Sequence, residues 1–151
     1  MVLSQKSQYA VRAVLELAKY HGLGPLTAAR IAEAQHLPVR FLENILGQLR
    51  QGGIVESVRG KEGGYLLSRS PYEVTVGDVI RLVQGPMEAV DCADMLAGGG
   101  QGCPLRPGCV LLPMWERAHQ AMMEVYDGTT FQELVDQERA NAVAEVLDYV
   151  I

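Results

Sequence analysis

Residues 39–67 read VRFLENILGQLRQGGIVESVRGKEGGYLL, and this stretch decides the fold. When the residues from Val39 to about Gln51 are placed at 100° per residue, they divide into two faces, which predicts an amphipathic helix. Gly52 and Gly53 then end it. The apolar face consists of Phe41, Leu42, Ile45, Leu46 and Leu49, and the polar face of Arg40, Glu43, Asn44, Gly47 and Gln51.

A short hairpin is predicted directly after this helix. Ile54 to Val58 and Tyr65 to Ser68 have the composition of two strands. The loop between them, RGKEGG, contains glycines that permit positive φ, and it carries the charges of Arg59 and Lys61. A phosphate-cradling nucleotide loop is the alternative. It is disfavoured because no Gly-Lys-Ser/Thr follows and because the loop joins strand to strand. A basic hairpin behind a helix is therefore predicted to be a wing.

The elements before this stretch complete a helix-turn-helix. Ser4 is a candidate N-cap for a helix that continues to about Tyr20 and is apolar nearly all round, so we expect it at the centre of the core. Thr27 is a candidate cap for a short helix, AARIAEAQ, and a tight turn then leads to the helix at Val39. A short helix, a turn and a second helix with a polar outer face are typical of a helix-turn-helix.

Three more helices are predicted downstream. Thr75 begins the helix VGDVIRLVQ, a longer helix extends from about Val110 to Tyr126, and Thr130 with Glu133 forms a candidate capping box for the last helix. The longer helix has apolar residues at alternating spacings of four and three, which favours packing along a partner helix. Packing on its own core is the alternative. These residues are Leu111, Trp115, Ala118, Met122 and Val125.

The predicted fold is therefore mainly α with a small β-wing: a winged helix-turn-helix plus a long dimerisation helix. We expect a DNA-binding domain over residues 1–84, a cysteine-containing loop over 85–109, and dimerisation and C-terminal helices over 110–151.

Charge is distributed unevenly along the chain. The net charge is −5, which taken alone argues against nucleic acid. Residues 1–70, however, contain nine Lys and Arg against five Asp and Glu, whereas residues 71–151 contain four against thirteen. The first part is thus at +4 and the second at −9. A basic half that contacts phosphates and an acidic half that faces away fit this distribution.

The remaining bulk properties indicate a folded cytoplasmic protein that is not an enzyme. No apolar run approaches the roughly 18 residues of a membrane span, and the start of the chain has no signal-peptide layout. Thiols stay reduced in the cytoplasm. No nucleophile–base pattern or nucleotide fingerprint is present, so we expect no catalytic residues.

Three cysteines, Cys92, Cys103 and Cys109, lie in the glycine-rich stretch DCADMLAGGGQGCPLRPGCVLL. Thiolates gathered in such a stretch suit a soft metal or an iron–sulfur cluster. Zinc is disfavoured because it usually takes four ligands, often with a Cys-x-x-Cys pair, which is absent. A thiol–disulfide switch needs only two of the three, and buried inert cysteines are a further alternative.

Three segments, SQKSQYAVRAVLELA, FLENILGQLRQGGIVESVRGKEGGYLLS and VTVGDVIRLVQG, resemble the Rrf family of winged-helix transcription regulators of the IscR, NsrR and RirA type. The likeness covers essentially the whole chain and is greatest to the IscR branch. Its most specific part is the wing pattern V-R-G-x-x-G-G-Y-x-L, which Val58 to Leu67 match. The resemblance implies a homodimer, with a long helix of each subunit crossing at the interface, that binds a roughly palindromic double-stranded DNA operator.

The resemblance also implies which residues contact DNA. The helix at residues 39–51 would enter the major groove, where Glu43 would accept a hydrogen bond from a cytosine amine. Arg59, next to Gly60, would enter the minor groove from the wing. The other members of the set lie on or beside the exposed helix face or contact phosphates, and some of these charges have the alternative role of solvating the surface. They are Arg40, Phe41, Asn44, Lys61 and Lys6.

In the family, three cysteines bind an iron–sulfur cluster and a non-cysteine residue commonly completes it. The resemblance therefore assigns the cluster to the three cysteines, with 2Fe–2S favoured over 4Fe–4S. Two positions depart from the pattern: Leu112 stands where the IscR-like histidine ligand lies, and Gln8 where the NsrR-like aspartate lies. The first cysteine gap is also longer than in IscR-like members. A residue of the second subunit could complete the site, as could Asp91, Asp94 or His119 of this chain.

The predicted function is a homodimeric transcription regulator that senses iron–sulfur, redox or nitric-oxide status through this cluster. Such a sensor works by a population shift, in which the state of the loop over residues 85–108 alters the geometry of the two recognition helices. A cluster-free thiol/disulfide regulator of the same fold is the alternative. An electron-transfer component and a winged-helix module that binds no DNA are less favoured, the latter because of the basic first half. Both repression and activation of target genes are open, with a repressor preferred.

Overall fold

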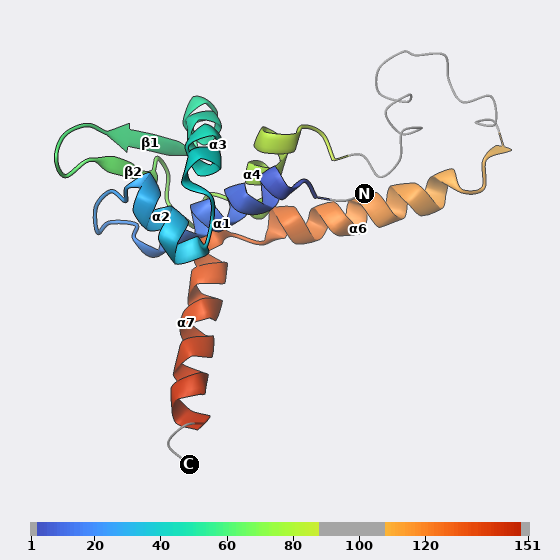
Figure 1. The fold of residues 1–151 in the computed structure, drawn as a ribbon. Coiled ribbons are helices and arrows are strands. Elements are labelled where there is room, and N and C mark those ends of the chain that lie inside the picture. Colours follow the sequence, from blue (N-terminus) through green and yellow to red (C-terminus); the bar gives the residue numbers. More distant parts are fainter. Residues whose placement is uncertain (1–2, 88–107, 149–151) are drawn as a thin grey trace.

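The computed structural model describes residues 3–87 and 108–148 (Figure 1). It is mainly helical with one two-stranded antiparallel sheet among the described residues, as the sequence predicts. In chain order the elements are α1 (Gln5–Lys19), α2 (Ala28–Gln35), α3 (Val39–Gln51), β1 (Val55–Val58), β2 (Gly64–Leu67), α4 (Val76–Gln84), α6 (Leu112–Gly128) and α7 (Phe131–Asp148).

The predicted N-caps fix where three of the helices begin. Side-chain oxygens of Ser4, Thr27 and Thr75 accept hydrogen bonds from backbone N–H groups in the first turns of α1, α2 and α4. At α4 the carboxylate of Asp78 also accepts from the Thr75 N–H at 3.1 Å, which closes a capping box. Each cap stabilises its helix by about 1 kcal/mol.

Helix α1 lies at the centre of the fold, as its nearly all-round apolar sequence predicts. It contacts α2, α3, α4, α7 and β2 (Figure 1). Ala10 and Ala13 are completely buried, and such small side chains allow several backbones to approach one helix. The apolar face of α3 packs on this centre through Leu42, Ile45, Leu46 and Leu49, all of which are fully buried.

The beginning of α7 belongs to the same core. Phe131 and Val135 are buried together with α1 residues, and the Phe131 N–H donates to the Val74 carbonyl at 3.0 Å. Of the predicted capping box, one half is present, because the Thr130 hydroxyl oxygen accepts from the Glu133 N–H at 3.2 Å. The rest of α7 extends away from the core into solvent (Figure 1).

The hairpin projects from the side of α3 as a wing (Figure 1). Its register pairs Val55 with Leu67 near the core and Val58 with Gly64 near the tip. The first strand starts one residue later than predicted and ends as predicted, and the second lies one residue earlier at both ends. Val55 and Leu67 are buried, whereas Val58 is exposed, so the tip lies in solvent. An isolated bridge between Leu26 and the second strand ties the hairpin to the start of α2.

Helix α6 begins at Leu112 and continues to Gly128, so it starts and ends two residues later than predicted. It extends away from the winged helix (Figure 1), and none of its residues is buried against the part of the chain that is described. Leu111 is 54% exposed and Val125 64%. The predicted seam therefore lacks a partner among the described residues. None of the described helices has the length and apolar character that crossing a bilayer requires.

Candidate nucleic-acid interface

The turn between α2 and α3 fixes the direction of α3. His36 ends α2 in the left-handed conformation at φ 51°, and its backbone N–H bonds back to carbonyls of the last turn. Leu37 is buried beneath the turn. With the apolar face of α3 anchored in the core, Arg40, Glu43 and Asn44 are exposed, as the predicted interface requires.

A hollow of about 590 Å³ lies along this exposed face of α3. Lys6, which comes from the first turn of α1, lies at this hollow although 33 or more residues separate it from α3 in sequence. At Gly47 an added Cβ would have nothing within 4 Å, so the hollow is open there. We call this surface the α3 groove; its lining residues are Lys6, Phe41, Glu43, Asn44, Gly47, Gln48 and Gln51.

Phe41 lies at the border of the two faces of α3, consistent with its prediction on the apolar face by periodicity and beside the exposed face by resemblance. It is 38% exposed, and its ring packs edge-on against Tyr9 of α1, with centroids 5.7 Å apart and planes at 83°. The reason is its position in the first turn of α3, at the periphery of the core. The aromatic pair holds α1 and α3 together beside the groove.

The wing tip presents two basic side chains. Arg59 and Lys61 are exposed, and neither forms an ion pair within the described part of the chain. Between them Gly60 has φ 112°, a conformation that favours glycine. The tip is closed by a bond from the Gly63 N–H to the Gly60 carbonyl at 3.0 Å. The predicted basic loop is thus a solvent-exposed turn that is closed by its own backbone hydrogen bond.

Three residues of the groove were not among the predicted DNA contacts: Gly47, which has no side chain, and two glutamines. Gln48 and Gln51 line it, and the side-chain oxygen of Gln48 is buried without a hydrogen-bond partner among the described residues. Both continue the helical row that begins at Asn44, at spacings of four and three. That spacing is the signal that would have found them.

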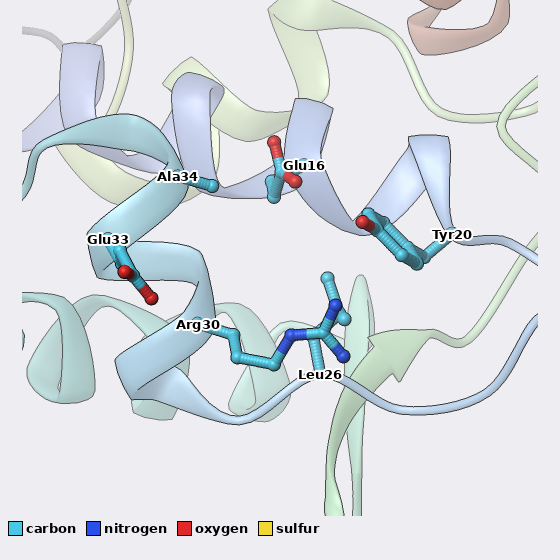
Figure 2. Close-up of a pocket in the computed structure, with 6 residues that line it drawn as sticks. All are labelled: Glu16, Tyr20, Leu26, Arg30, Glu33 and Ala34. Atoms are coloured by element: carbon cyan, nitrogen blue, oxygen red, sulfur yellow. The ribbon is translucent and has the colours of Figure 1, made fainter.

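A second pocket, of about 190 Å³, lies between α1 and α2 behind the helix-turn-helix (Figure 2). Arg30 reaches across it to the Tyr20 ring, with 5.5 Å from the guanidinium carbon to the ring centroid. Glu16, 5% exposed, accepts from the Gln35 side chain at 2.8 Å and pairs with Lys19 at 2.6 Å. These contacts hold α2, and with it the turn, against α1.

Lys19 extends this polar network to α7. Its ammonium lies 3.3 Å from a carboxylate oxygen of Glu138. Burial by itself lowers the pKa of Lys19, but hydrogen bonds to Glu16 and Glu138 and their negative charges outweigh burial and raise this pKa above its usual value. The network therefore favours the charged lysine.

An ion pair connects α4 to the far end of α6. Arg81 donates to the Asp127 carboxylate at 2.6 Å and lies 3.3 Å from Asp78. The bond to Asp127 is the largest of the effects that hold the pKa of Arg81 above its usual value. Asp127 approaches α4 at Gly77, where an added Cβ would collide with its carboxylate. The absence of a side chain at this glycine thus allows the end of α6 to dock on α4.

Of the predicted cluster ligands, the structure describes only Cys109. Its thiol is free and half-buried, three residues before the first residue of α6. Cys92 and Cys103 lie outside the described residues, as do Asp91 and Asp94. The described ranges contain no group of three or more His, Cys, Asp or Glu that is able to hold a metal ion.

The described candidates for the fourth position do not complete a ligand set. Leu112 is half-buried in the first turn of α6, and leucine has no lone pair to donate. Gln8 is exposed, and its amide nitrogen donates to the Leu3 carbonyl at 3.0 Å. His119 has a buried Nδ1 without a partner among the described residues, but it lies two turns, about 10 Å, beyond Leu112. The thiolates suit a cluster, while the fourth ligand has no assigned donor.

Comparisons with known proteins agree over most of the chain. The model of the Rrf2 family, described as an iron-dependent transcriptional regulator, matches residues 3–137. The HTH-type transcriptional regulator IscR of Pectobacterium carotovorum is 34% identical over 148 residues, which cover 98% of this chain and 87% of the relative. The family and this relative are transcriptional regulators and not enzymes, as the sequence predicts.

Solved structures share the fold. IscR of T. potens matches with a TM-score of 0.72 at 33% identity, over 91% of this chain and 88% of the other. CymR (YrzC), the global cysteine regulator of B. subtilis, matches with a TM-score of 0.74 at 34% identity, over 91% and 98% of the two chains.

Proposed function

The chain belongs to the Rrf2 family of transcriptional regulators, and from this membership we propose that it is a homodimeric regulator that binds a roughly palindromic DNA operator in the cytoplasm. The observation that carries the proposal is the exposure of a polar helix face and of a basic wing in one helix-turn-helix. Lys6 lines the α3 groove, Arg59 and Lys61 lie at the wing tip, and none of the three forms an ion pair among the described residues.

In this proposal α3 lies in the major groove and the wing tip reaches the minor groove. The Glu43 carboxylate would accept a hydrogen bond from a cytosine amine, and the amide of Asn44 is able to pair with an adenine edge. Arg59 would enter the minor groove, and Lys61 and Lys6 would contact phosphates. The open position at Gly47 leaves room for the DNA backbone to approach α3.

The dimer is proposed to form through α6. A helix of 17 residues, none of which is fully buried against the described chain, supports packing against a second copy, and so do the exposed Val125 and the exposed Leu111 just before the helix. A two-fold dimer matches a two-fold operator, whose half-sites then lie about 34 Å apart, one turn of DNA. We therefore propose that residues 1–84 bind DNA and that residues 110–151 form the dimer, as the sequence predicts.

The sensor is proposed to be an iron–sulfur cluster held by Cys92, Cys103 and Cys109. When bound, such a cluster supplies a centre that responds to iron supply, oxidants and nitric oxide. What this chain contributes is the thiolates and their placement, because Cys109 lies three residues before α6. A change at Cys109 therefore acts on the start of the helix that we assign to the dimer. The 2Fe–2S type remains the preferred assignment, with 4Fe–4S as the alternative.

A cluster-free thiol switch is the second candidate. It is favoured by the likeness to B. subtilis CymR, a global cysteine regulator, at 34% identity. In this mechanism two of the cysteine thiols lose two protons and two electrons to a peroxide or disulfide oxidant and form one disulfide. The third thiol stays free, and no fourth ligand is needed.

DNA binding is tested with a fluorescent duplex that the wild-type protein itself selects from a random pool. Arg59→Ala should weaken binding about tenfold or more, because each subunit of the variant loses a contact in the DNA minor groove and a positive charge. Arg139→Ala removes an exposed arginine on α7, remote from the groove, and serves as the matched control. The wing assignment is wrong if the two variants bind equally well.

The sensor is tested by anaerobic purification, optical spectroscopy and iron counting of the wild type and of single Cys→Ser variants. A cluster gives a coloured protein whose iron content falls in each of the three variants. A colourless, iron-free protein after anaerobic reconstitution would exclude the cluster. In that case, the thiol switch would be established if oxidation abolishes operator binding by the wild type but not by the Cys→Ser variants.

A further inference from the structure

Gln84, the last residue of α4, binds the beginning of α1. Its side-chain oxygen accepts from the Ser4 backbone N–H at 2.9 Å and from the Ser7 hydroxyl at 3.0 Å. Ser4 is the N-cap of α1, and Ser7 is fully buried in its first turn. One amide oxygen thus joins two helix ends that are about 80 residues apart in sequence.

The donors in this cluster are determined by its chemistry. A backbone N–H can only donate, so the Gln84 atom beside it must be the carbonyl oxygen. That oxygen has no hydrogen, so the Ser7 hydroxyl donates to it. The hydroxyl of Ser4, 2.8 Å from that of Ser7, then donates to Ser7, while it accepts the Ser7 N–H at 3.1 Å. The backbone N–H groups and the hydroxyls of Ser4 and Ser7 thus each donate one hydrogen bond within the cluster, which gives the first turn of α1 one arrangement.

Lys6 lies between these two serines in the same helical turn. It is also the one residue of α1 that lines the α3 groove. The direction in which Lys6 leaves α1 is therefore set by the turn that Gln84 holds. Without the two bonds, the first turn of α1 is secured only by its own cap and frays more readily.

We propose that Gln84 is a positioning residue for DNA binding, which keeps Lys6 at the α3 groove by holding the first turn of α1. The inference rests on the proposed function, because it concerns how the operator is bound. Through Gln84, the surface proposed to bind the operator is also connected to the end of α4. The helix ends at the next residue, Gly85, which has φ 91°.

A double-mutant cycle on operator affinity tests the inference. Lys6→Ala in the wild type removes one charge per subunit and should lower affinity about tenfold at 100 mM salt. Gln84→Met keeps the length of the side chain and removes the acceptor. In that background Lys6→Ala should cost less than about twofold, since Lys6 is no longer held in place. Equal losses in both backgrounds would overturn the inference.

Gln84→Glu is the conservative variant, because a carboxylate accepts both bonds. It should restore the full effect of Lys6→Ala, and failure to do so would also count against the inference. Gln120→Met, on the exposed face of α6, controls for the substitution itself and should leave the cycle unchanged. If Gln84→Met fails to fold, Ser7→Ala can replace it, because it removes one of the two bonds. In the Ser7→Ala background, Lys6→Ala should cost less operator affinity than in the wild type.

Amide hydrogen exchange gives a readout that does not depend on DNA. The Ser4 N–H should exchange about tenfold faster in Gln84→Met, as expected for the loss of one net hydrogen bond, and at the wild-type rate in Gln84→Glu. Unchanged exchange in Gln84→Met would overturn the inference. A wild-type protein that selects no duplex at all would overturn the proposed function, and this inference with it, whereas selection with an additive cycle overturns the inference alone.

Discussion

Raising the salt concentration should weaken operator binding steeply, because in the proposed complex basic side chains of each subunit face the DNA without internal partners. Four belong to this set: Lys6 at the α3 groove, Arg40 on α3, and Arg59 and Lys61 at the wing tip. None of the four forms an ion pair within the described part of the chain. Their charges are therefore available to replace the cations that DNA releases on binding.

The magnitude follows from the number of charges. Four per subunit make eight in a dimer, so the slope of log affinity against log salt should be about −7 if all eight are used. Between 50 and 150 mM KCl the affinity then falls roughly 2,000-fold. Lys61→Ala removes two charges from the dimer, which should change the slope to about −5 and the loss over the same range to roughly 250-fold.

Fluorescence anisotropy titrations at four or more KCl concentrations measure the slope with one labelled duplex. Arg139→Ala changes the net charge of the protein by the same amount as Lys61→Ala, but on the exposed side of α7. Its slope should equal that of the wild type. The reasoning is refuted if Lys61→Ala leaves the slope unchanged. It is also refuted if Arg139→Ala makes the slope less negative by the same amount, because the effect would then follow net charge and not the position of the side chain.

Phe131→Ala should destabilise the fold by about 3–5 kcal/mol in urea unfolding, because it empties a fully buried position of the core; a loss below 1 kcal/mol would mean that α7 is not part of this core. Gly64→Ala should cost about 1–3 kcal/mol, since its Cβ would collide with the Leu26 carbonyl, and unfolding by circular dichroism measures this. The raised pKa of Lys19 means that its contribution to stability is complete below about pH 10.4 and is lost as pH rises through the higher folded-state pKa. The difference in unfolding free energy between wild type and Lys19→Met should therefore be constant from pH 6 to 9 and shrink only above pH 10.4; a change near neutral pH would contradict this. Trp115→Glu, at the predicted α6 seam, should convert the dimer to monomer in analytical ultracentrifugation, and an unchanged dimer would place the interface elsewhere.

The helices could be predicted closely because their signals are local. Hydrophobic periodicity and the serine and threonine caps determined the starts of α1, α2 and α4, and α3 agrees with its prediction at both ends. Three of the four strand bounds differ from the prediction by one residue, since the hairpin is short and mostly exposed. The end of α6 lies beyond its prediction, because Asp127 docks on α4 and a bond from the Val76 N–H to the Thr129 carbonyl determines where the chain turns. Such tertiary contacts leave no local pattern.

The exposed face of α3 was predictable for the same reason, since a buried apolar face fixes the opposite one. The roles of individual residues in DNA contact remain predictions. The proximity of Lys6 to α3 and its connection to Gln84 depend on how α1 crosses the other helices, which no spacing in the sequence reveals. Periodicity placed Phe41 on the apolar face and the resemblance placed it on or beside the exposed one, because periodicity assigns a face but not the depth of burial at a helix end.

The burial of Phe131 and Val135 against α1 also has a consequence for how the protein is made. The ribosome releases every element of the winged helix before it synthesises these two residues. Until they emerge, the apolar side of α1 that they cover stays open in the nascent chain, a surface that chaperones and proteases recognise. The winged helix therefore completes its core only after α6 has been synthesised. A nascent chain that ends in the cysteine segment would therefore leave this apolar surface of α1 uncovered.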